Sequence, residues 1–422
     1  MDSMVVTGGR PLKGRVRVSG AKNAALPLMA AAILADGPMR LRNVPDLADI
    51  RTMTRLLGEL GVRVQREPNG DMVLETVNEE PVRAPYDIMK TMRAGICVLG
   101  PLVAKRGRAE VSLPGGCVIG DRPVNIHLRG LHALGADVKV DHGYIFGSCK
   151  RLGGAEIYLG GPFGSTVTGT ENVLMAAALA EGKTVIDCAA CEPEVQELAR
   201  MLGEMGARIS GIGSPRLFVE GVDRLRGIEH AVGPDRIEAG TFLVAGAATG
   251  GDVTVEGARW EDLFALISVL EEIGAEIERT DDSIRVRAGG RLRSADVTTL
   301  PFPGFPTDLQ AQMMALLARS EGNSIIIEKV FPDRFLHVAE LNRMRARIRK
   351  EGNVSVIHGV DHLSGAPVMA GDLRASAALV VAGLVAEGET TIQRIYHLDR
   401  GYERLEEKLS SLGAQVRRVK ES

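Results

Sequence analysis

The stretch Leu60-Gly61-Val62-Arg63-Val64 ends an apolar helical pattern at a glycine and begins an alternating strand. Glycine is the usual residue just past a helix C-terminus, because it adopts the left-handed conformation without steric cost. The same phrase, Leu/Met/Ile-Gly-Ala/Val-x-Val/Ile, recurs about every 70 residues. The other copies lie at 134–138, 205–209, 273–277 and 412–416, with a degraded copy at 344–348 in which Arg345 replaces the glycine. Six copies of one unit therefore organise the chain.

A second helix-ending glycine occurs once in each repeat and precedes a β-rich run. These glycines are Gly37, Gly107, Gly182, Gly251, Gly322 and Gly388. Each repeat is predicted to hold about two helices and three or four short strands. Because about 70 residues make a marginal domain alone, we predict an α/β protein with two domains of three repeats. The alternative is a repeat array around one continuous core.

Two stretches are predicted to mark domain boundaries. Residues 225–230 interrupt the third and fourth repeats, so one boundary is expected near 225–235. The other is expected near 18–21, where an N-terminal strand ends before the first helix. No low-complexity linker separates the halves, so short connections are predicted to join them.

Composition excludes several classes of function. The net charge is −3 and only 4% of residues are aromatic, which disfavours a nucleic-acid-binding surface. The longest apolar stretch, 375–386, is too short to span a bilayer, and no secretory signal is recognised at the N-terminus. Five scattered cysteines fit a reducing cytoplasm better than a disulfide framework. We expect a cytoplasmic globular protein that binds neither membrane nor nucleic acid.

The loop Leu113-Pro114-Gly115-Gly116-Cys117-Val118-Ile119-Gly120-Asp121-Arg122-Pro123 contains the strongest candidate for chemistry. Its glycines and prolines exclude a helix or a central strand. The loop therefore presents the Cys117 thiol on a pliable segment close to Arg122, and a nearby cation favours the thiolate. The alternative is that Cys117 is a buried filler, as most lone cysteines are.

Other candidates each have a structural alternative. Lys22 and Asn23 lie at the mouth of an apolar helix and could form an anion site, or Ser19 or Asn23 could simply cap that helix. Asp308 and Asp372 precede apolar helices, where they could act as bases or only stabilise the helix ends. Four arginines next to turn or helix-start signals could clamp a small dianion if they converge, and these are Arg93, Arg122, Arg374 and Arg400.

Two motif-like stretches are rejected. Gly182-Lys183-Thr184 imitates the end of a phosphate-binding loop, but Ala177 occupies the position of the required glycine, and the tripeptide follows a helix. Cys188-Ala189-Ala190-Cys191 lacks a second cysteine pair or a nearby histidine to complete a zinc site.

Seven dispersed motifs resemble the UDP-N-acetylglucosamine 1-carboxyvinyltransferases, a family of enolpyruvyl transferases. The matching stretches are Lys22-Asn23, Leu113-Pro114-Gly115-Gly116-Cys117, Arg122-Pro123-Val124, Pro234-Asp235-Arg236-Ile237-Glu238, Phe305-Pro306-Thr307-Asp308, Asp372-Leu373-Arg374-Ala375-Ser376 and Asp399-Arg400-Gly401-Tyr402-Glu403-Arg404. The resemblance implies an inside-out α/β barrel fold with three βαβαββ repeats in each of two domains, 22–229 and 1–21 plus 230–422. It also implies an active site in the interdomain cleft and a first strand that pairs with the C-terminal domain.

The reaction implied by the resemblance is transfer of enolpyruvyl from phosphoenolpyruvate to the 3-hydroxyl of the UDP-sugar, with release of phosphate. This addition–elimination opens peptidoglycan synthesis and needs neither a metal nor a cofactor. By the same resemblance, Cys117 protonates the methylene carbon and reacts with the epoxide fosfomycin, Asp308 is the base and Asp372 relays protons. Lys22, Arg122 and Arg400 hold phosphate and carboxylate, with Arg93 alongside. Contacts to the UDP-sugar are expected from Asn23, Pro123, Val124, Asn125, Ile126, Thr166, Val167, Val330, Arg334 and Leu373.

The sequence departs from the family pattern at four places. Asn125 stands where many members have Asp, the segment 164–170 differs from that of some members, Cys191 replaces a frequent Arg, and Arg345 replaces the repeat glycine. The rival readings are the shikimate-pathway enolpyruvyl transferase, which lacks the cysteine loop, and a non-catalytic paralogue that binds a UDP-sugar.

Overall fold

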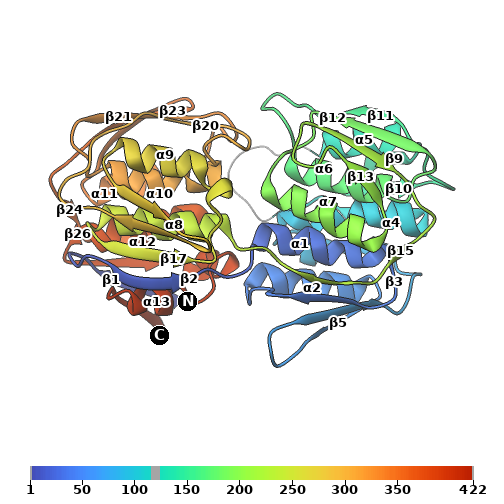
Figure 1. The fold of residues 1–422 in the computed structure, drawn as a ribbon, viewed down its shortest axis with the longest axis horizontal. Helices are drawn as coiled ribbons and strands as arrows, with labels where there is room; N and C mark the ends of the chain where they lie inside the picture. Colours follow the sequence, from blue (N-terminus) through green and yellow to red (C-terminus); the bar gives the residue numbers. More distant parts are fainter. Residues whose placement is uncertain (1, 116–123, 421–422) are drawn as a thin grey trace. The chain divides into compact units, whose positions relative to one another are not determined.

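The structure is a computed structural model, and it describes residues 2–115 and 124–420. The chain forms two compact units (Figure 1). Unit 1 comprises the chain up to Ser19 and from Pro234 onwards, and unit 2 runs from Gly20 to Gly233, apart from residues that are not described. Buried apolar side chains form one cluster in each unit, so the alternative of a single continuous core is wrong.

Each unit contains three four-stranded sheets of the same topology within the described residues. In unit 2 the strand orders are β16-β4-β6-β5, β7-β8-β10-β9 and β11-β12-β14-β13. The strands of these sheets are β4 (Met39–Arg42), β5 (Val62–Arg66), β6 (Met72–Thr76), β7 (Arg83–Ala84), β8 (Arg108–Ser112), β9 (Asp137–Asp141), β10 (Tyr144–Ser148), β11 (Glu156–Tyr158), β12 (Lys183–Asp187), β13 (Arg208–Ser210), β14 (Arg216–Glu220) and β16 (Glu229–Ala231).

In unit 1 the orders are β2-β17-β19-β18, β20-β21-β23-β22 and β25-β27-β1-β28. The strands are β1 (Asp2–Thr7), β2 (Lys13–Arg17), β17 (Asp252–Glu256), β18 (Glu276–Arg279), β19 (Ser283–Arg287), β20 (Val297–Thr299), β21 (Asn323–Glu328), β22 (Arg347–Glu351), β23 (Val354–His358), β25 (Pro367–Met369), β27 (Glu389–Gln393) and β28 (Gln415–Lys420). Two short pairs, β3 (Ala35–Asp36) with β15 (Leu225–Arg226) and β24 (Leu363–Ser364) with β26 (Ala386–Glu387), complete the described strands.

All six sheets share one pairing pattern. The first two strands of each order run parallel, and the remaining neighbours are antiparallel. A parallel pair needs a crossover helix, whereas an antiparallel pair needs only a turn, which accounts for the βαβαββ order of each repeat. The predicted six repeats, three in each of two units, are confirmed.

The ends of each unit's chain close its sheets. In unit 1, β1 lies between β27 and β28, which come from the far end of the sequence. In unit 2, β16 pairs with β4 in the same way. The first strand therefore belongs with the C-terminal part of the chain, as the family resemblance implied.

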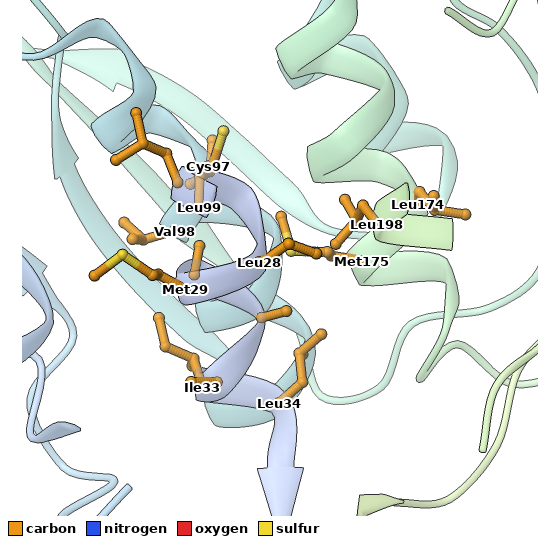
Figure 2. Packing of buried hydrophobic residues seen from close by; sticks show 14 of the residues in the cluster. Leu28, Met29, Ile33, Leu34, Cys97, Val98, Leu99, Leu174, Met175 and Leu198 are labelled. Atoms are coloured by element: carbon orange, nitrogen blue, oxygen red, sulfur yellow. The ribbon is translucent and has the colours of Figure 1, made fainter. Parts of the chain in front are cut away.

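Six core helices lie inside the units and are buried along most of their length. They are α1 (Lys22–Ala30), α4 (Leu99–Arg106) and α6 (Val167–Ala177) in unit 2, and α8 (Arg236–Ala248), α10 (Thr307–Leu317) and α12 (Leu373–Val385) in unit 1. A helix that is apolar on all sides suits only an interior position. Figure 2 shows the consequence in unit 2, where Leu28 and Met29 of α1, Leu99 of α4 and Met175 of α6 belong to one apolar cluster.

The remaining helices are amphipathic or short. They are α2 (Ala48–Glu59), α3 (Tyr86–Met89), α5 (Asn125–Ala133), α7 (Pro193–Met205), α9 (Phe264–Glu272), α11 (His337–Arg343) and α13 (Leu405–Ser411), with 3-10 turns η1 (Ala31–Leu34), η2 (Arg93–Val98), η3 (Trp260–Asp262) and η4 (Ile395–Arg400). None of the helices in the described part of the chain is both long and apolar enough to cross a membrane.

The repeated glycines adopt the conformation that their position predicts. The five glycines of the Leu-Gly-Ala/Val phrase all have positive φ, between 75° and 120°. Arg345, at the sixth position, has a φ of 70°, so the degraded copy keeps the backbone turn without the glycine. In the second set, the prediction is wrong for Gly251, because the residue with positive φ there is Gly250. It is also wrong that Gly37 and Gly388 end helices directly, because they follow the short strands β3 and β26.

The left-handed backbone conformation of Arg345 therefore destabilises the folded protein, whereas glycine would adopt it without strain. We expect Arg345→Gly to raise the free energy of unfolding by about 1 kcal/mol, because its side chain is exposed and only the left-handed backbone is relieved. The matched reverse change is Gly413→Ala, where an added Cβ would meet nothing within 4 Å. This variant is expected to lose about 1 kcal/mol in denaturant unfolding. Equal stability of all three proteins would contradict the explanation.

Candidate active site

Polar residues of the core helices gather at the N-terminal turns. The interiors of α8, α10 and α12 are almost entirely apolar, while buried polar side chains lie in their first two turns or just before them. These residues are Asp235, Glu238, Thr241, Gln310, Gln312, Asp372, Arg374 and Ser376, and they are joined by the half-buried Thr307 and Asp308 in the first turn of α10. The N-terminal end of a helix carries unsatisfied N–H groups and a partial positive charge, so polar and anionic groups are stabilised there.

Asp308 is in the first turn of α10, and its carboxylate lies between the side chains of Arg334 and Arg374. Its Oδ1 accepts a hydrogen bond from Arg334 Nη1 at 2.7 Å. Its Oδ2 accepts two from Arg374, from Nε at 3.1 Å and Nη2 at 2.8 Å. The arginine side chains are 7% and 2% exposed and that of Asp308 is 24% exposed, so the carboxylate is the accessible member of the trio.

The two guanidinium groups determine the charge of Asp308. Burial alone would raise its pKa, but the charges of Arg374 and Arg334 and their hydrogen bonds outweigh it and hold the pKa well below the usual range. Three N–H donors occupy a carboxylate that offers about four acceptor positions. Asp308 is thus a fixed anion that can accept one more hydrogen bond, and it does not serve as the N-cap of α10, which is Pro306.

Asp372 is the N-cap of α12. One of its oxygens accepts hydrogen bonds from the backbone N–H of Arg374 at 2.8 Å and Ala375 at 3.0 Å. The capping alternative for Asp372 is therefore correct as far as this oxygen is concerned. The bonds also fix the backbone of Arg374, whose side chain holds Asp308.

Leu373 and Arg400 lie at the same end of α12. The backbone of Gly401 packs so closely on Leu373 that an added Cβ would come within 2.6 Å of the leucine side chain. Arg400, the last residue of η4, is half-buried. Val330 follows β21, and its N–H donates to Glu328 Oε1 at 2.8 Å. Six of the predicted site residues thus belong to unit 1, namely Asp308, Val330, Arg334, Asp372, Leu373 and Arg400.

Lys22 begins α1 in unit 2, and its ammonium lies 3.4 Å from Oδ2 of Asp49 in the first turn of α2. Both side chains are almost fully buried. The helix-capping alternative is wrong here, because the N-cap of α1 is Ala21 and no side chain caps the helix. Ser19 instead contacts Glu403 and Lys408.

Asn23 and Arg93 are both half-buried, the first in α1 and the second at the start of η2. The beginning of the glycine-rich loop lies beside the C-terminal end of α3. Gly115 N donates to the Met89 carbonyl at 3.1 Å, and an added Cβ on Gly115 would lie 2.4 Å from the Lys90 carbonyl oxygen. Cys117, Arg122 and Pro123 lie outside the described residues.

The predicted nucleotide contacts Val124, Asn125, Ile126, Thr166 and Val167 lie at the N-terminal ends of α5 and α6, which pack together. His127, missed by the sequence analysis, joins the two helices. Its Nδ1 lies 2.9 Å from Asn172 Nδ2 and its Nε2 lies 3.3 Å from Thr168 Oγ1. Because the Asn172 amide nitrogen can only donate, Nδ1 accepts and the imidazole proton lies on Nε2.

Three residues of the structure could not be identified from the local sequence pattern. Asp49 carried no signal because it belongs to an outer helix, Arg334 was placed only by family resemblance, and His127 looks like any core histidine. Of the two rejected stretches, Lys183 and Thr184 belong to β12 rather than to a helix end, and Cys188 to Cys191 lie between β12 and α7. The described residues contain no group of three or more His, Cys, Asp or Glu side chains that could hold a metal ion.

The two-unit fold of six βαβαββ repeats, with charged groups at the ends of buried helices, defines the class of enolpyruvyl transferases. A family model described as EPSP synthase (3-phosphoshikimate 1-carboxyvinyltransferase) matches residues 6–409. The chain belongs to this family.

The chain is also similar over its whole length to individual members of this family. The chain is 55% identical to "UDP-N-acetylglucosamine 1-carboxyvinyltransferase" of Anaeromyxobacter sp. (strain Fw109-5), with 100% of both chains covered. It is 55% identical to the protein of that name from Sorangium cellulosum (strain So ce56), with 99% of both covered. The family resemblance found in the dispersed motifs is confirmed.

Solved structures agree on the fold. The enolpyruvyl transferase NikO from Streptomyces tendae superposes with a TM-score of 0.90 at 24% identity, covering 100% of this chain and 99% of that one. An EPSP synthase from Acinetobacter baumannii superposes with a TM-score of 0.76 at 18% identity, covering 100% of both. The predicted fold class is confirmed.

A buried acid in unit 2 gives a pH-dependent prediction. Glu171 of α6 is 1% exposed and accepts a hydrogen bond from the Cys97 thiol at 3.4 Å. Burial, with smaller contributions from Glu194 and Glu192, raises its pKa to about 8. The folded protein then holds a proton that the unfolded chain releases above its usual pKa of 4.5, so stability should fall as pH rises from about 4.5 to 8.

Glu171→Gln should remove this component, because the amide does not ionise. We expect the variant to gain on the order of 2 kcal/mol over the wild type at pH 8 relative to pH 5, as measured by denaturant unfolding. The matched control is Glu181→Gln, which changes an exposed carboxylate that follows the same helix. Parallel stability curves for Glu171→Gln and wild type would show that Glu171 does not retain its proton.

Proposed function

We propose that this protein transfers the enolpyruvyl group of phosphoenolpyruvate to the 3-hydroxyl of UDP-N-acetylglucosamine and releases phosphate. The observation that carries the proposal is the 54–55% identity, over essentially the whole chain, to three proteins named for this activity. The shikimate-pathway alternative is disfavoured, because the EPSP synthase structure is only 18% identical. Five scattered cysteines suit a reducing compartment, so we place the reaction in the cytoplasm.

In the proposed reaction, Cys117 protonates the methylene carbon of phosphoenolpyruvate while the sugar hydroxyl adds to the adjacent carbon and loses its proton. Loss of phosphate and of one methyl proton from the resulting tetrahedral intermediate restores the double bond. A thiol suits the acid role because its pKa can be tuned towards neutrality. The proposed role of Cys117 rests on the family motif.

The proposed cations are Lys22, Arg93, Arg122 and Arg400, which hold the phosphate and carboxylate of phosphoenolpyruvate. Lys22 suits this role because burial beside Asp49 fixes its ammonium in place. Protonating the enol builds positive character at the reacting carbon, so these cations must position the substrate without opposing that charge.

Asp308 is the proposed base, and its two arginines limit how it can act. A carboxylate with a lowered pKa orients a hydroxyl well but holds a proton poorly, at about 1.4 kcal/mol for each unit of pKa. We therefore propose that Asp308 aligns the sugar hydroxyl and passes its proton on rather than storing it. Asp372, whose backbone contacts fix Arg374, is the proposed relay.

The proposed contacts to the UDP-sugar are those that the family resemblance implies. Asn23, Pro123, Val124, Asn125, Ile126, Thr166 and Val167 belong to unit 2, and Val330, Arg334 and Leu373 to unit 1. Asn125 is exposed at the first position of α5, where a neutral amide replaces the acid of many family members. The amide can still donate and accept hydrogen bonds, so we propose that it retains a contact to the nucleotide.

The first experiment measures phosphate release from phosphoenolpyruvate with UDP-N-acetylglucosamine or shikimate 3-phosphate as the acceptor. We expect release only with the UDP-sugar, and its loss in Cys117→Ala, because the acid would be missing. Release with shikimate 3-phosphate alone would identify the rival enzyme. No release with either acceptor, in protein shown to be folded, would support a binding-only paralogue and refute the proposal.

The second experiment tests Asp308 with Asp308→Asn. The amide keeps the size of the side chain but removes the anion, so kcat/KM with the UDP-sugar should fall by about 10²–10⁴-fold. The matched control is Asp333→Asn, an exposed carboxylate next to Arg334, which should change kcat/KM by less than about twofold. Circular dichroism must confirm folding, because the loss of Asp308 leaves two buried guanidinium groups without their counter-charge. A folded Asp308→Asn protein with wild-type turnover would exclude Asp308 from the chemistry.

A further inference from the structure

Glu328, the last residue of β21, carries a buried carboxylate that receives four hydrogen bonds in unit 1. Its exposed fraction is 0%. Oε1 accepts from Thr299 Oγ1 at 2.6 Å and from the backbone N–H groups of Val330 at 2.8 Å and Phe331 at 2.9 Å. Oε2 accepts from Thr307 Oγ1 at 2.9 Å. One side chain therefore joins the end of β20, the segment after β21 and the start of α10.

These hydrogen bonds connect Glu328 to Asp308 through Thr307 and Arg334. The Thr307 hydroxyl donates its proton to Glu328 Oε2. The lone pairs of the same hydroxyl are then available to Arg334, whose Nη1 donates to Thr307 Oγ1 at 3.1 Å. That Nη1 also donates to Asp308 Oδ1 at 2.7 Å. Glu328 thereby orients the hydroxyl that holds Arg334 against Asp308.

The repeat architecture does not require an acid at this position. The strands equivalent to β21 in the other sheets end in five different residue types: Arg42, Ser112, Asp187, Glu256 and Gln393. Glu256, the same residue type at the end of β17, turns outward to Arg15 and is 26% exposed. Glu328 and Glu256 thus end equivalent strands but differ in burial and in hydrogen-bond partners.

We propose that Glu328 is a positioning residue for UDP-sugar binding, acting through Thr307 and Arg334 on Asp308 and through its backbone contact on Val330. The proposal rests on the function proposed above. Glu328 is fully buried, so we assign it no contact with substrate. Glu328 keeps the carboxylate of Asp308 and the segment after β21 in one fixed arrangement.

The test variant is Glu328→Gln. An amide has one acceptor oxygen and one donor nitrogen, so it cannot accept all four bonds, and a donor at the Oε2 position would turn the Thr307 hydroxyl away. We expect KM for UDP-N-acetylglucosamine to rise about tenfold, with KM for phosphoenolpyruvate changed by less than about twofold. The matched control, Glu256→Gln, should leave both KM values at wild-type levels, because it removes only a surface ion pair.

Changes at Thr307 test the hydroxyl itself. Thr307→Val removes the relay and should raise KM for the UDP-sugar as Glu328→Gln does, whereas Thr307→Ser keeps a hydroxyl and should restore a KM near that of the wild type. The double variant Glu328→Gln/Thr307→Val should be little worse than either single variant, since both break the same chain of hydrogen bonds. If Thr307→Ser behaves like Thr307→Val, the relay is refuted.

Hydrogen–deuterium exchange gives a readout that does not depend on turnover. In Glu328→Gln the amides of Val330 and Phe331 should exchange faster than in Glu256→Gln, because the neutral amide oxygen that replaces Oε1 is a weaker acceptor than the carboxylate. Wild-type exchange and wild-type KM in Glu328→Gln would overturn the proposal. Wild-type protein that releases no phosphate with the UDP-sugar would instead refute the proposed function, and the exchange measurement alone would then decide whether Glu328 anchors this segment.

Discussion

The structure depends on burying helices that are apolar on every side. A helix such as α12 has no polar stripe to face water, so it is stable only inside a unit, with its remaining polar groups confined to its ends. The sheets of the repeats enclose three such helices in each unit. The constraint determines where chemistry is possible, because the first turns of the core helices are the places where charged side chains can be both fixed and reached.

The same constraint explains why the charged groups occur in sets. A lone carboxylate at the depth of Asp308 would tend to take up a proton, and the two arginines prevent this by supplying counter-charge and three hydrogen bonds. Arg374 is held in turn by the cap that Asp372 forms on its backbone. Each member is stabilised by another, which gives a rigid arrangement at the expense of the basicity of Asp308.

The sequence predicted the features that depend on local conformation. The helix-ending glycines defined six repeats, and the backbone followed that pattern so closely that even Arg345 adopts the glycine conformation. The sequence could not predict contacts between distant segments. Arg334 and Asp308 are 26 residues apart and His127 and Asn172 are 45 apart, and neither pair has a spacing that identifies it. Asp308 was recognised from its position at the start of a helix, but its two partners depend on how the chain folds within its repeat and on how the next repeat packs against it.

The inner position of β1 has a consequence for the order of assembly. The strand is made first, yet its two neighbours, β27 and β28, are made last. In the sequence, unit 2 lies between β1 and these two strands. All strands of unit 2 have been synthesised once Gly233 has been added. During synthesis from the N-terminus, the Val5 and Val6 segment must therefore wait unpaired while a whole unit folds behind it. A ribosome-bound chain would carry this exposed strand until almost its last residue is added, and only then could unit 1 close.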